Sequence, residues 1–271
     1  ESFWVYNNNK DDVNYFSSLA KDFNRNETVI QISNRRLGRL RDASVLYYPG
    51  PDIAKQARHR RFFGDDGWSI CGITHTTASS GATEGIIDLV SSPVREWDGL
   101  ICPSSAVKGH VSNIITAQKE YMQSELGATQ FSLPQMPVIP LGINMEEFVF
   151  SERFKQNSRS SLGLDENTVA FLYVGRLSFH AKANPIQMYK ALEFTSKKTK
   201  KNLTLIECGW FANDWIRNAF VEAASKICPS VKVIHLDGRV PEERAKAWSA
   251  ADIFCSLSDN IQETFGIVPL E

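Results

Sequence analysis

The chain has 271 residues, of which 42% are hydrophobic, and it carries 30 Lys and Arg residues against 31 Asp and Glu residues. The hydrophobic fraction is sufficient for a packed core and excludes a disordered chain, and the length fits one large domain or two smaller ones. A net charge of −1 excludes the basic excess on which nucleic-acid binding usually depends.

Short apolar runs typical of strands alternate with stretches of helical periodicity from one end of the chain to the other. In the first half the predicted strands are 3–6, 28–32, 44–48, 68–74, 99–103 and 136–140, and the predicted helices are 13–23, 53–62, 83–91 and 107–126. In the second half the predicted strands are 169–174, 203–208, 232–236 and 252–257, and the predicted helices are 186–197, 214–227 and 241–250. This alternation indicates parallel sheets covered on both faces. We therefore predict an α/β chain with two Rossmann-like domains, over residues 1–141 and 142–271.

The cysteines and the hydropathy indicate in which cellular compartment the protein is expected. The five cysteines form an odd set without a C-x-x-C pair, which disfavours a zinc or disulfide framework and is typical of a reducing compartment. No apolar run approaches the roughly 20 residues that span a bilayer. We expect a cytoplasmic protein, at most peripheral to a membrane. Arginine clusters at 35–41 and 58–61 are interpreted as solvated faces, with contact to an anionic lipid or an anionic acceptor as the alternative.

The last stretch of the chain, 256–271, carries the strongest candidate site. A predicted strand ends near Leu257, and a polar loop leads through Gly266 into an apolar helix start. A glycine at such a turn lets an anionic group approach backbone N–H groups, as in phosphate sites. Glu263 and Glu271, eight residues apart, could flank one ligand. The alternative is a surface loop acid and a solvated helix glutamate.

A second candidate follows the buried strand 169–174, which leads directly into Gly175 and Arg176, with Lys182 six residues further on. Two cations at a strand end would neutralise a diphosphate leaving group without a metal. The chain contains no D-x-D motif that would hold Mg²⁺ at the phosphates. The alternative is a solvated arginine and lysine in a loop.

Two further strand ends carry candidate residues. His75 ends a buried strand and is either catalytic or structural. The strand 232–236 leads into a glycine turn, after which Pro241 and two acids are typical of a first helical turn.

Taken together, these motifs resemble the family-four (group 1) retaining glycosyltransferases of the GT-B fold. The resemblance rests on the run 138–148, which is similar to the interdomain signature of that family, and on the runs 174–182, 237–244 and 263–271, which follow in the family's order. It is specific over residues 138–271 and weaker over residues 1–137.

The resemblance implies retaining, metal-independent transfer of a hexose from a UDP- or GDP-linked sugar to an unknown acceptor, which is a sugar, a lipid-linked molecule or a small molecule. The nucleotide sugar is the donor substrate, and no cofactor is implied. His75 would meet the donor sugar near the scissile bond, and Glu263 would face the sugar hydroxyls.

The resemblance also implies a set of donor-binding residues. Arg176 and Lys182 would hold the diphosphate, Val240 would lie by the base, and Glu271 would bind the ribose. Gly266 and Ile267 would offer backbone N–H groups to phosphate or sugar, and Phe265 belongs to the same donor site.

Relative to this family, we expect a C-terminally truncated second domain, because the chain ends inside the helix of the acidic motif. Such a chain could be inactive, and a sheet without its last strands would expose apolar surface and favour oligomers. Leu270-Glu271 is also a common vector-derived dipeptide, so Glu271 is either native or added.

Two other functions remain open. One is a GT-B enzyme that epimerises or hydrolyses a sugar nucleotide in the same pocket, and the other is a non-catalytic or truncated nucleotide-sugar-binding protein. A dehydrogenase is disfavoured because no G-x-G-x-x-G follows any predicted strand.

Overall fold

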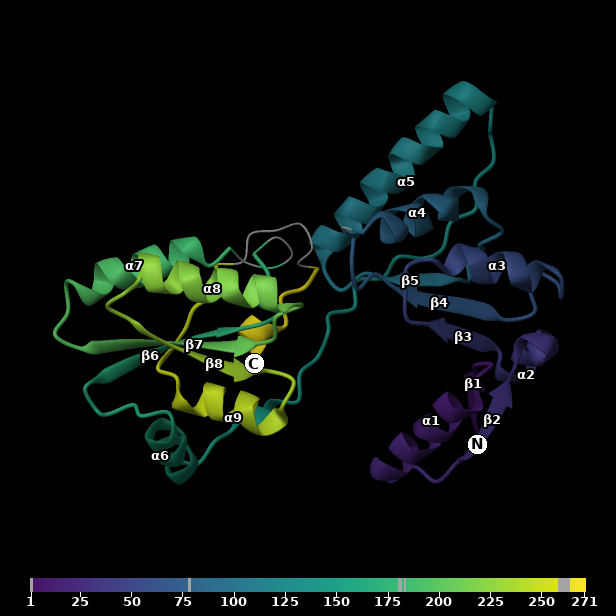
Figure 1. Ribbon diagram of the computed structural model, residues 1–271. Helices are drawn as coiled ribbons and strands as arrows, with labels where there is room; N and C mark the ends of the chain where they lie inside the picture. Colours follow the sequence, from purple (N-terminus) through teal and green to yellow (C-terminus); the bar gives the residue numbers. More distant parts are fainter. Residues whose placement is uncertain (1, 78, 180–181, 183, 258–263) are drawn as a thin grey trace. The chain divides into compact units, whose positions relative to one another are not determined.

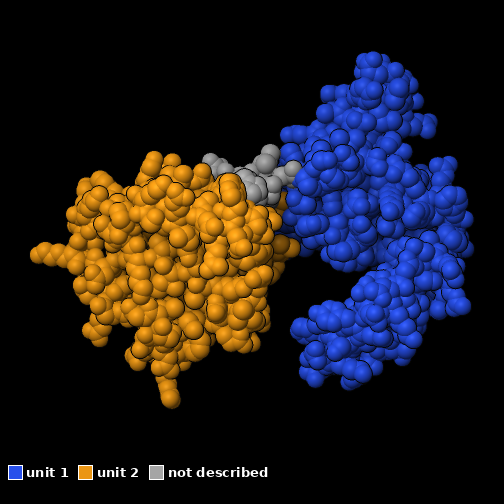
Figure 2. Space-filling model, in the orientation of Figure 1, with its two compact units in different colours: residues 1–140 blue, residues 141–271 orange. Residues whose placement is uncertain are grey.

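The chain divides into two compact units, unit 1 (Glu1–Pro140) and unit 2 (Leu141–Glu271), which are coloured separately in Figure 2. The structure is a computed structural model that describes residues 2–77, 79–179, 182, 184–257 and 264–271. The division falls one residue before the boundary that the sequence predicts, in a segment that contains several prolines.

Unit 1 alternates strands and helices. Its strands are β1 (Ser2–Tyr6), β2 (Thr28–Ile32), β3 (Val45–Tyr48), β4 (Ser69–Ile73) and β5 (Gly99–Ile101). Its helices are α1 (Lys10–Asp22), α2 (Leu40–Ala43), α3 (Ile53–Arg61), α4 (Ser80–Asp88) and α5 (Ser105–Leu126), with 3₁₀ turns at Asn34–Arg39 and Leu89–Ser91. The strands pair in parallel, β1 with β2, and β4 with β3 on one side and β5 on the other.

Residues 136–140 do not form the strand that the sequence predicts. Two prolines, Pro137 and Pro140, remove backbone donors from this segment. What remains is an isolated parallel bridge between Val138 and Cys102, in which the Ile139 N–H donates to the Cys102 carbonyl at 3.0 Å. The segment therefore lies along β5 without extending the sheet.

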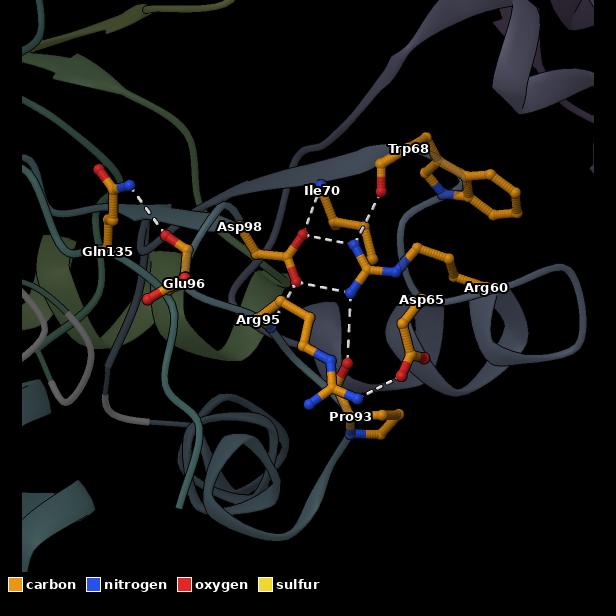
Figure 3. A network of polar contacts seen from close by, with 9 residues as sticks. All are labelled: Arg60, Asp65, Trp68, Ile70, Pro93, Arg95, Glu96, Asp98 and Gln135. Carbon is orange, nitrogen blue, oxygen red and sulfur yellow. Dashed lines mark hydrogen bonds and ion pairs between the residues drawn. The ribbon is translucent and has the colours of Figure 1, made fainter. Parts of the chain in front are cut away.

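A buried ion pair lies in the interior of unit 1 (Figure 3). The Arg60 guanidinium donates to both carboxylate oxygens of Asp98, at 2.6 and 2.8 Å, and both side chains are fully buried. Arg60 also donates to the carbonyls of Trp68 and Pro93. The interpretation of the 58–61 cluster as a solvated face is therefore wrong for Arg60, because the Asp98 carboxylate compensates its charge inside the core.

In the described part of unit 2, four strands form a parallel sheet in the order β8-β7-β6-β9. Its strands are β6 (Thr168–Val174), β7 (Asn202–Gly209), β8 (Lys232–Asp237) and β9 (Ile253–Phe254). Its helices are α6 (Glu152–Ser161), α7 (Ile186–Ser196), α8 (Asp214–Ile227) and α9 (Pro241–Ala250), with 3₁₀ turns at Met145–Phe148 and Val268–Leu270. The chain adds β7 and β8 on one side of β6 and then places β9 on the other, so the strand order reverses between β6 and β9.

Helices cover both faces of this sheet, α7 and α8 on one and α6 and α9 on the other (Figure 1). Alternate residues of the strands supply the two cores, because successive side chains of a strand point to opposite faces. Leu203 and Leu205 pack with Tyr189 and Phe220 in the first core, and Ile206 packs with the second. This burial explains why β6 and β7 are apolar on both faces.

All five cysteines are free thiols. Cys102, Cys208 and Cys228 are buried, and Cys71 and Cys255 are partly buried. Burial raises the pKa of the Cys208 and Cys228 thiols to about 11. Across the described residues, no helix combines the length and the hydropathy needed to cross a bilayer.

Candidate functional site

A cavity of about 440 Å³ lies at the carboxyl ends of β6 and β9 in unit 2. In open parallel sheets, ligands bind at the carboxyl ends of the strands where the strand order reverses, and β6 and β9 flank that reversal. The described residues that line the cavity are Tyr173, Val174, Gly175, Lys182, Phe254, Ser256, Gly266, Ile267, Val268 and Pro269. The cavity is therefore placed where the topology predicts a ligand.

The connections that leave the strands are held against one another at this edge of the sheet. The Gly175 N–H donates to the Cys208 carbonyl and the Leu177 N–H to the Trp210 carbonyl, both at 3.0 Å. The close approach requires a glycine at 209, because a Cβ there would lie 1.9 Å from the Gly175 oxygen. Backbone contacts thus fix the turn that precedes Arg176.

Residues of the C-terminal segment form another wall of the cavity. Gly266 has a φ of +76°, a conformation that strains any other residue, and a 3₁₀ turn at Val268–Leu270 follows it. The sequence predicts a helix start here, and the described residues form this short turn instead. Gly266 and Ile267, both predicted donor-binding residues, line the cavity.

Of the two predicted cations, Lys182 lines the cavity. Its backbone N–H donates to the Ser178 carbonyl at 3.0 Å, which ties it to the segment after β6. Arg176 directly follows Gly175 and is partly exposed, and it is not among the described residues that line the cavity. The structure thus brings Lys182 to the cavity and places Arg176 one residue beyond its wall.

A charged turn follows β8, where the sequence places Val240. The Arg239 guanidinium donates to Asp237, from Nη2 to Oδ2 at 2.7 Å, and lowers the pKa of that carboxyl to about 2. Val240 precedes the first turn of α9, and its side chain is exposed. Val240 is not among the described residues that line the cavity.

The remaining predicted residues of unit 2 lie near the end of the chain. Phe265 is partly exposed and precedes Gly266. Burial raises the pKa of the Glu271 carboxyl, an effect that the nearby Arg244 guanidinium opposes. Glu263 lies outside the described residues. Phe265 and Glu271 are not among the described residues that line the cavity.

His75 lies in unit 1 at the carboxyl end of β4. The preceding Thr74 N–H donates to the Ile101 carbonyl at 2.9 Å, which fixes the backbone between β4 and β5, and the His75 side chain is exposed. The histidine therefore lies at the carboxyl end of β4, and the described strands of this sheet run in the order β3-β4-β5 with no reversal at β4.

Sequence reasoning missed a buried polar cluster formed by residues of β7, α7 and β8. Glu207 of β7 is fully buried and contacts the side chains of Tyr189 and His235. The signal in the sequence was a single acid within the apolar run of β7, since a charged residue is almost never buried without partners. Tyr173 and Ser256, which line the cavity, were also not singled out.

Comparison of the sequence with family models gives a match over residues 154–271 to the family described as "Glycosyl transferases group 1". The matched segment contains every predicted donor-binding residue. No curated protein matches the chain.

Two solved structures resemble the chain along most of its length. HepE of Anabaena, solved in complex with UDP and glucose, superposes with a TM-score of 0.54 at 14% identity, covering 90% of this chain and 64% of its own. The N-terminal domain of trehalose-6-phosphate phosphatase of Candida albicans gives a TM-score of 0.57 at 13% identity, covering 96% of this chain and 70% of its own. At these identities the likeness shows the fold, and it confirms the predicted α/β chain with two Rossmann-like parts. The chain spans less than two thirds of the length of HepE.

Proposed function

We propose that the chain binds a nucleotide sugar and takes part in transfer of the hexose to an acceptor with retention of configuration, because residues 154–271 match the family model of the group 1 glycosyl transferases. The chain covers 64% of HepE, so the complete transfer reaction is part of the proposal. The acceptor is a sugar, a lipid-linked molecule or a small molecule.

The observation that carries the proposal is the position of the cavity in unit 2. It opens where the strand order reverses, it is about 440 Å³ in volume, and the described residues that line it include the basic residue Lys182 together with Gly266 and Ile267. A diphosphate requires cations and backbone N–H donors. In this proposal Lys182 supplies a cation, and Gly266 and Ile267 supply the backbone N–H groups.

The proposed chemistry uses these groups on the leaving group. As the bond between the sugar and the diphosphate breaks, negative charge grows on the diphosphate, and a fixed cation stabilises it without rearrangement. Lys182 and Arg176 supply this charge in the proposal, Val240 contacts the base, and Glu271 binds the ribose. His75 and Glu263 act at the donor sugar.

We propose that this transfer needs no metal, because two cations replace Mg²⁺ at the diphosphate and the sequence contains no D-x-D motif. Free thiols at all five cysteines support a reducing compartment, and we assign the protein to the cytoplasm.

Calorimetry with UDP- and GDP-linked hexoses tests donor binding, with the Lys182→Ala variant as the comparison. We expect binding of one of the two nucleotide classes and a loss of affinity in the variant. Product analysis with added acceptors then tests transfer, and a chelator tests the role of metals. Absence of binding for both classes would refute the proposal, and conversion of the donor without transfer would favour an epimerase or hydrolase instead.

A further inference from the structure

A fully buried carboxylate lies two residues before the end of β7, in the middle of the sheet of unit 2. Glu207 accepts a hydrogen bond from the Tyr189 hydroxyl at 2.7 Å on Oε1, and its Oε2 lies 2.8 Å from His235 Nε2. Burial and the neighbouring Glu207 raise the pKa of Tyr189 far above its ordinary value, so the hydroxyl remains a donor. Both carboxylate oxygens thus have a partner, which offsets the cost of burying the group.

The hydrogen bond from Tyr189 attaches Glu207 to α7, the helix that follows Lys182 in the chain. Tyr189 lies in the first turn of α7 and is fully buried, and its N–H donates to the Pro185 carbonyl at 2.9 Å. Lys182 lies only a few residues before this turn. This hydrogen bond therefore holds against the sheet the first turn of α7, the helix that follows Lys182 in the chain.

The contact with His235 connects Glu207, through Phe211, to the residue next to Arg176. The His235 ring packs against the ring of Phe211 with centroids 5.4 Å apart. Phe211 forms an isolated parallel bridge with Leu177, which is the residue next to Arg176. A shift of His235 would therefore be transmitted through one aromatic contact to the backbone beside Arg176.

We propose that Glu207 is a positioning residue that holds the Arg176 and Lys182 segments in register for one diphosphate. The inference rests on the proposed function for the identity of the ligand. Glu207 itself is not among the described residues that line the cavity, and it acts through Tyr189, His235 and Phe211. Its neutral replacement would keep the shape of the core and weaken both attachments.

Unit 2 offers a matched control at the opposite edge of the sheet. Glu193 of α7 accepts hydrogen bonds from Ser230, from the backbone N–H at 3.0 Å and from the hydroxyl at 3.1 Å. Ser230 precedes β8, so this carboxylate also joins α7 to β8, but near the amino ends of the strands. Glu193→Gln therefore weakens a second attachment between α7 and the start of β8, about one helical turn beyond Tyr189.

The experiment compares the full chain with its Glu207→Gln, Tyr189→Phe and Glu193→Gln variants. Calorimetry measures the affinity for UDP and UMP, and for GDP and GMP, and thermal unfolding ranks stability. We expect Glu207→Gln and Tyr189→Phe to bind the diphosphate about fivefold to tenfold more weakly, with a smaller change for the monophosphate, as expected for one weakened charge-assisted contact. Glu193→Gln should lose stability and keep the ratio of diphosphate to monophosphate affinity.

Amide hydrogen exchange provides a readout that does not depend on the ligand. Protection at Leu177 and Lys182 should fall in Tyr189→Phe and Glu207→Gln and stay unchanged in Glu193→Gln. If the wild-type chain binds neither UDP nor GDP, but exchange differs among the variants in this way, the proposed function fails and the positioning role of Glu207 stands. Equal affinity ratios and equal exchange in all three variants would overturn the positioning role.

Discussion

Removal of the Asp98 carboxylate should destabilise unit 1 far more than removal of any exposed carboxylate. Asp98 accepts four hydrogen bonds in the interior, two from Arg60 at 2.6 and 2.8 Å and one each from the Ile70 and Arg95 N–H groups at 2.8 Å. Asp98→Ala leaves the guanidinium buried with carbonyl partners and no counter-charge, and two backbone donors lose their acceptor.

The expected magnitude follows from the burial of the pair. Breaking a fully buried ion pair by removing one partner costs about 3–5 kcal/mol, a large share of the roughly 5–15 kcal/mol that stabilises a domain. The chain also contains an exposed pair of the same type, Arg58 with Asp88 at 2.8 Å, whose side chains are 45% and 49% exposed. Asp88→Ala should cost no more than about 1 kcal/mol, because solvent screens such a pair.

Urea unfolding monitored separately for the two units measures the difference. With a slope of about 1–3 kcal/mol per molar urea, Asp98→Ala should lower the midpoint of unit 1 by about 2 M and leave unit 2 unchanged, and Asp88→Ala should shift it only slightly. Exchanging both partners for apolar residues, Arg60→Met with Asp98→Leu, leaves no buried charge and should cost less than Asp98→Ala alone. Equal midpoints for Asp98→Ala and Asp88→Ala would refute the reasoning.

Three further variants test the candidate site. Gly209→Ala places a Cβ 1.9 Å from the Gly175 oxygen, so it should lower the stability of unit 2 by about 1–3 kcal/mol and weaken donor binding, as seen by urea unfolding and calorimetry. Lys182→Ala should weaken binding of a nucleoside diphosphate by about tenfold or more, as expected for a lost charge-assisted contact, while the thermal midpoint stays unchanged. Arg239→Ala should raise the pKa of Asp237 from about 2 toward its ordinary 3.8 in an NMR titration. The stability that ionised Asp237 contributes is present above pH 3.8 and lost as the pH falls toward 2, so in the variant this loss should shrink.

The class of fold, and the strand ends that line the cavity of the candidate site, can be predicted from local patterns in the sequence. The period and the length of the apolar runs predict α8 at Asp214–Ile227 and α9 at Pro241–Ala250 with the ends that the structure shows. These signals are local, because caps and periodicity depend on residues a few positions apart. For the same reason, Gly175 and Gly266 marked the strand end and the turn that line the cavity.

Contacts between distant residues could be decided only by the tertiary structure. The arginines at 58–61 are equivalent in the sequence, yet Arg60 is buried, because the Asp98 carboxylate lies opposite it across 38 positions of the chain. Glu207 has the same explanation, since its partners Tyr189 and His235 come from other elements. The order β8-β7-β6-β9 likewise depends on which strands pair, and this pairing turns separate strand ends into one cavity. Local patterns carry information on which residues can act, and long-range packing decides which of them meet.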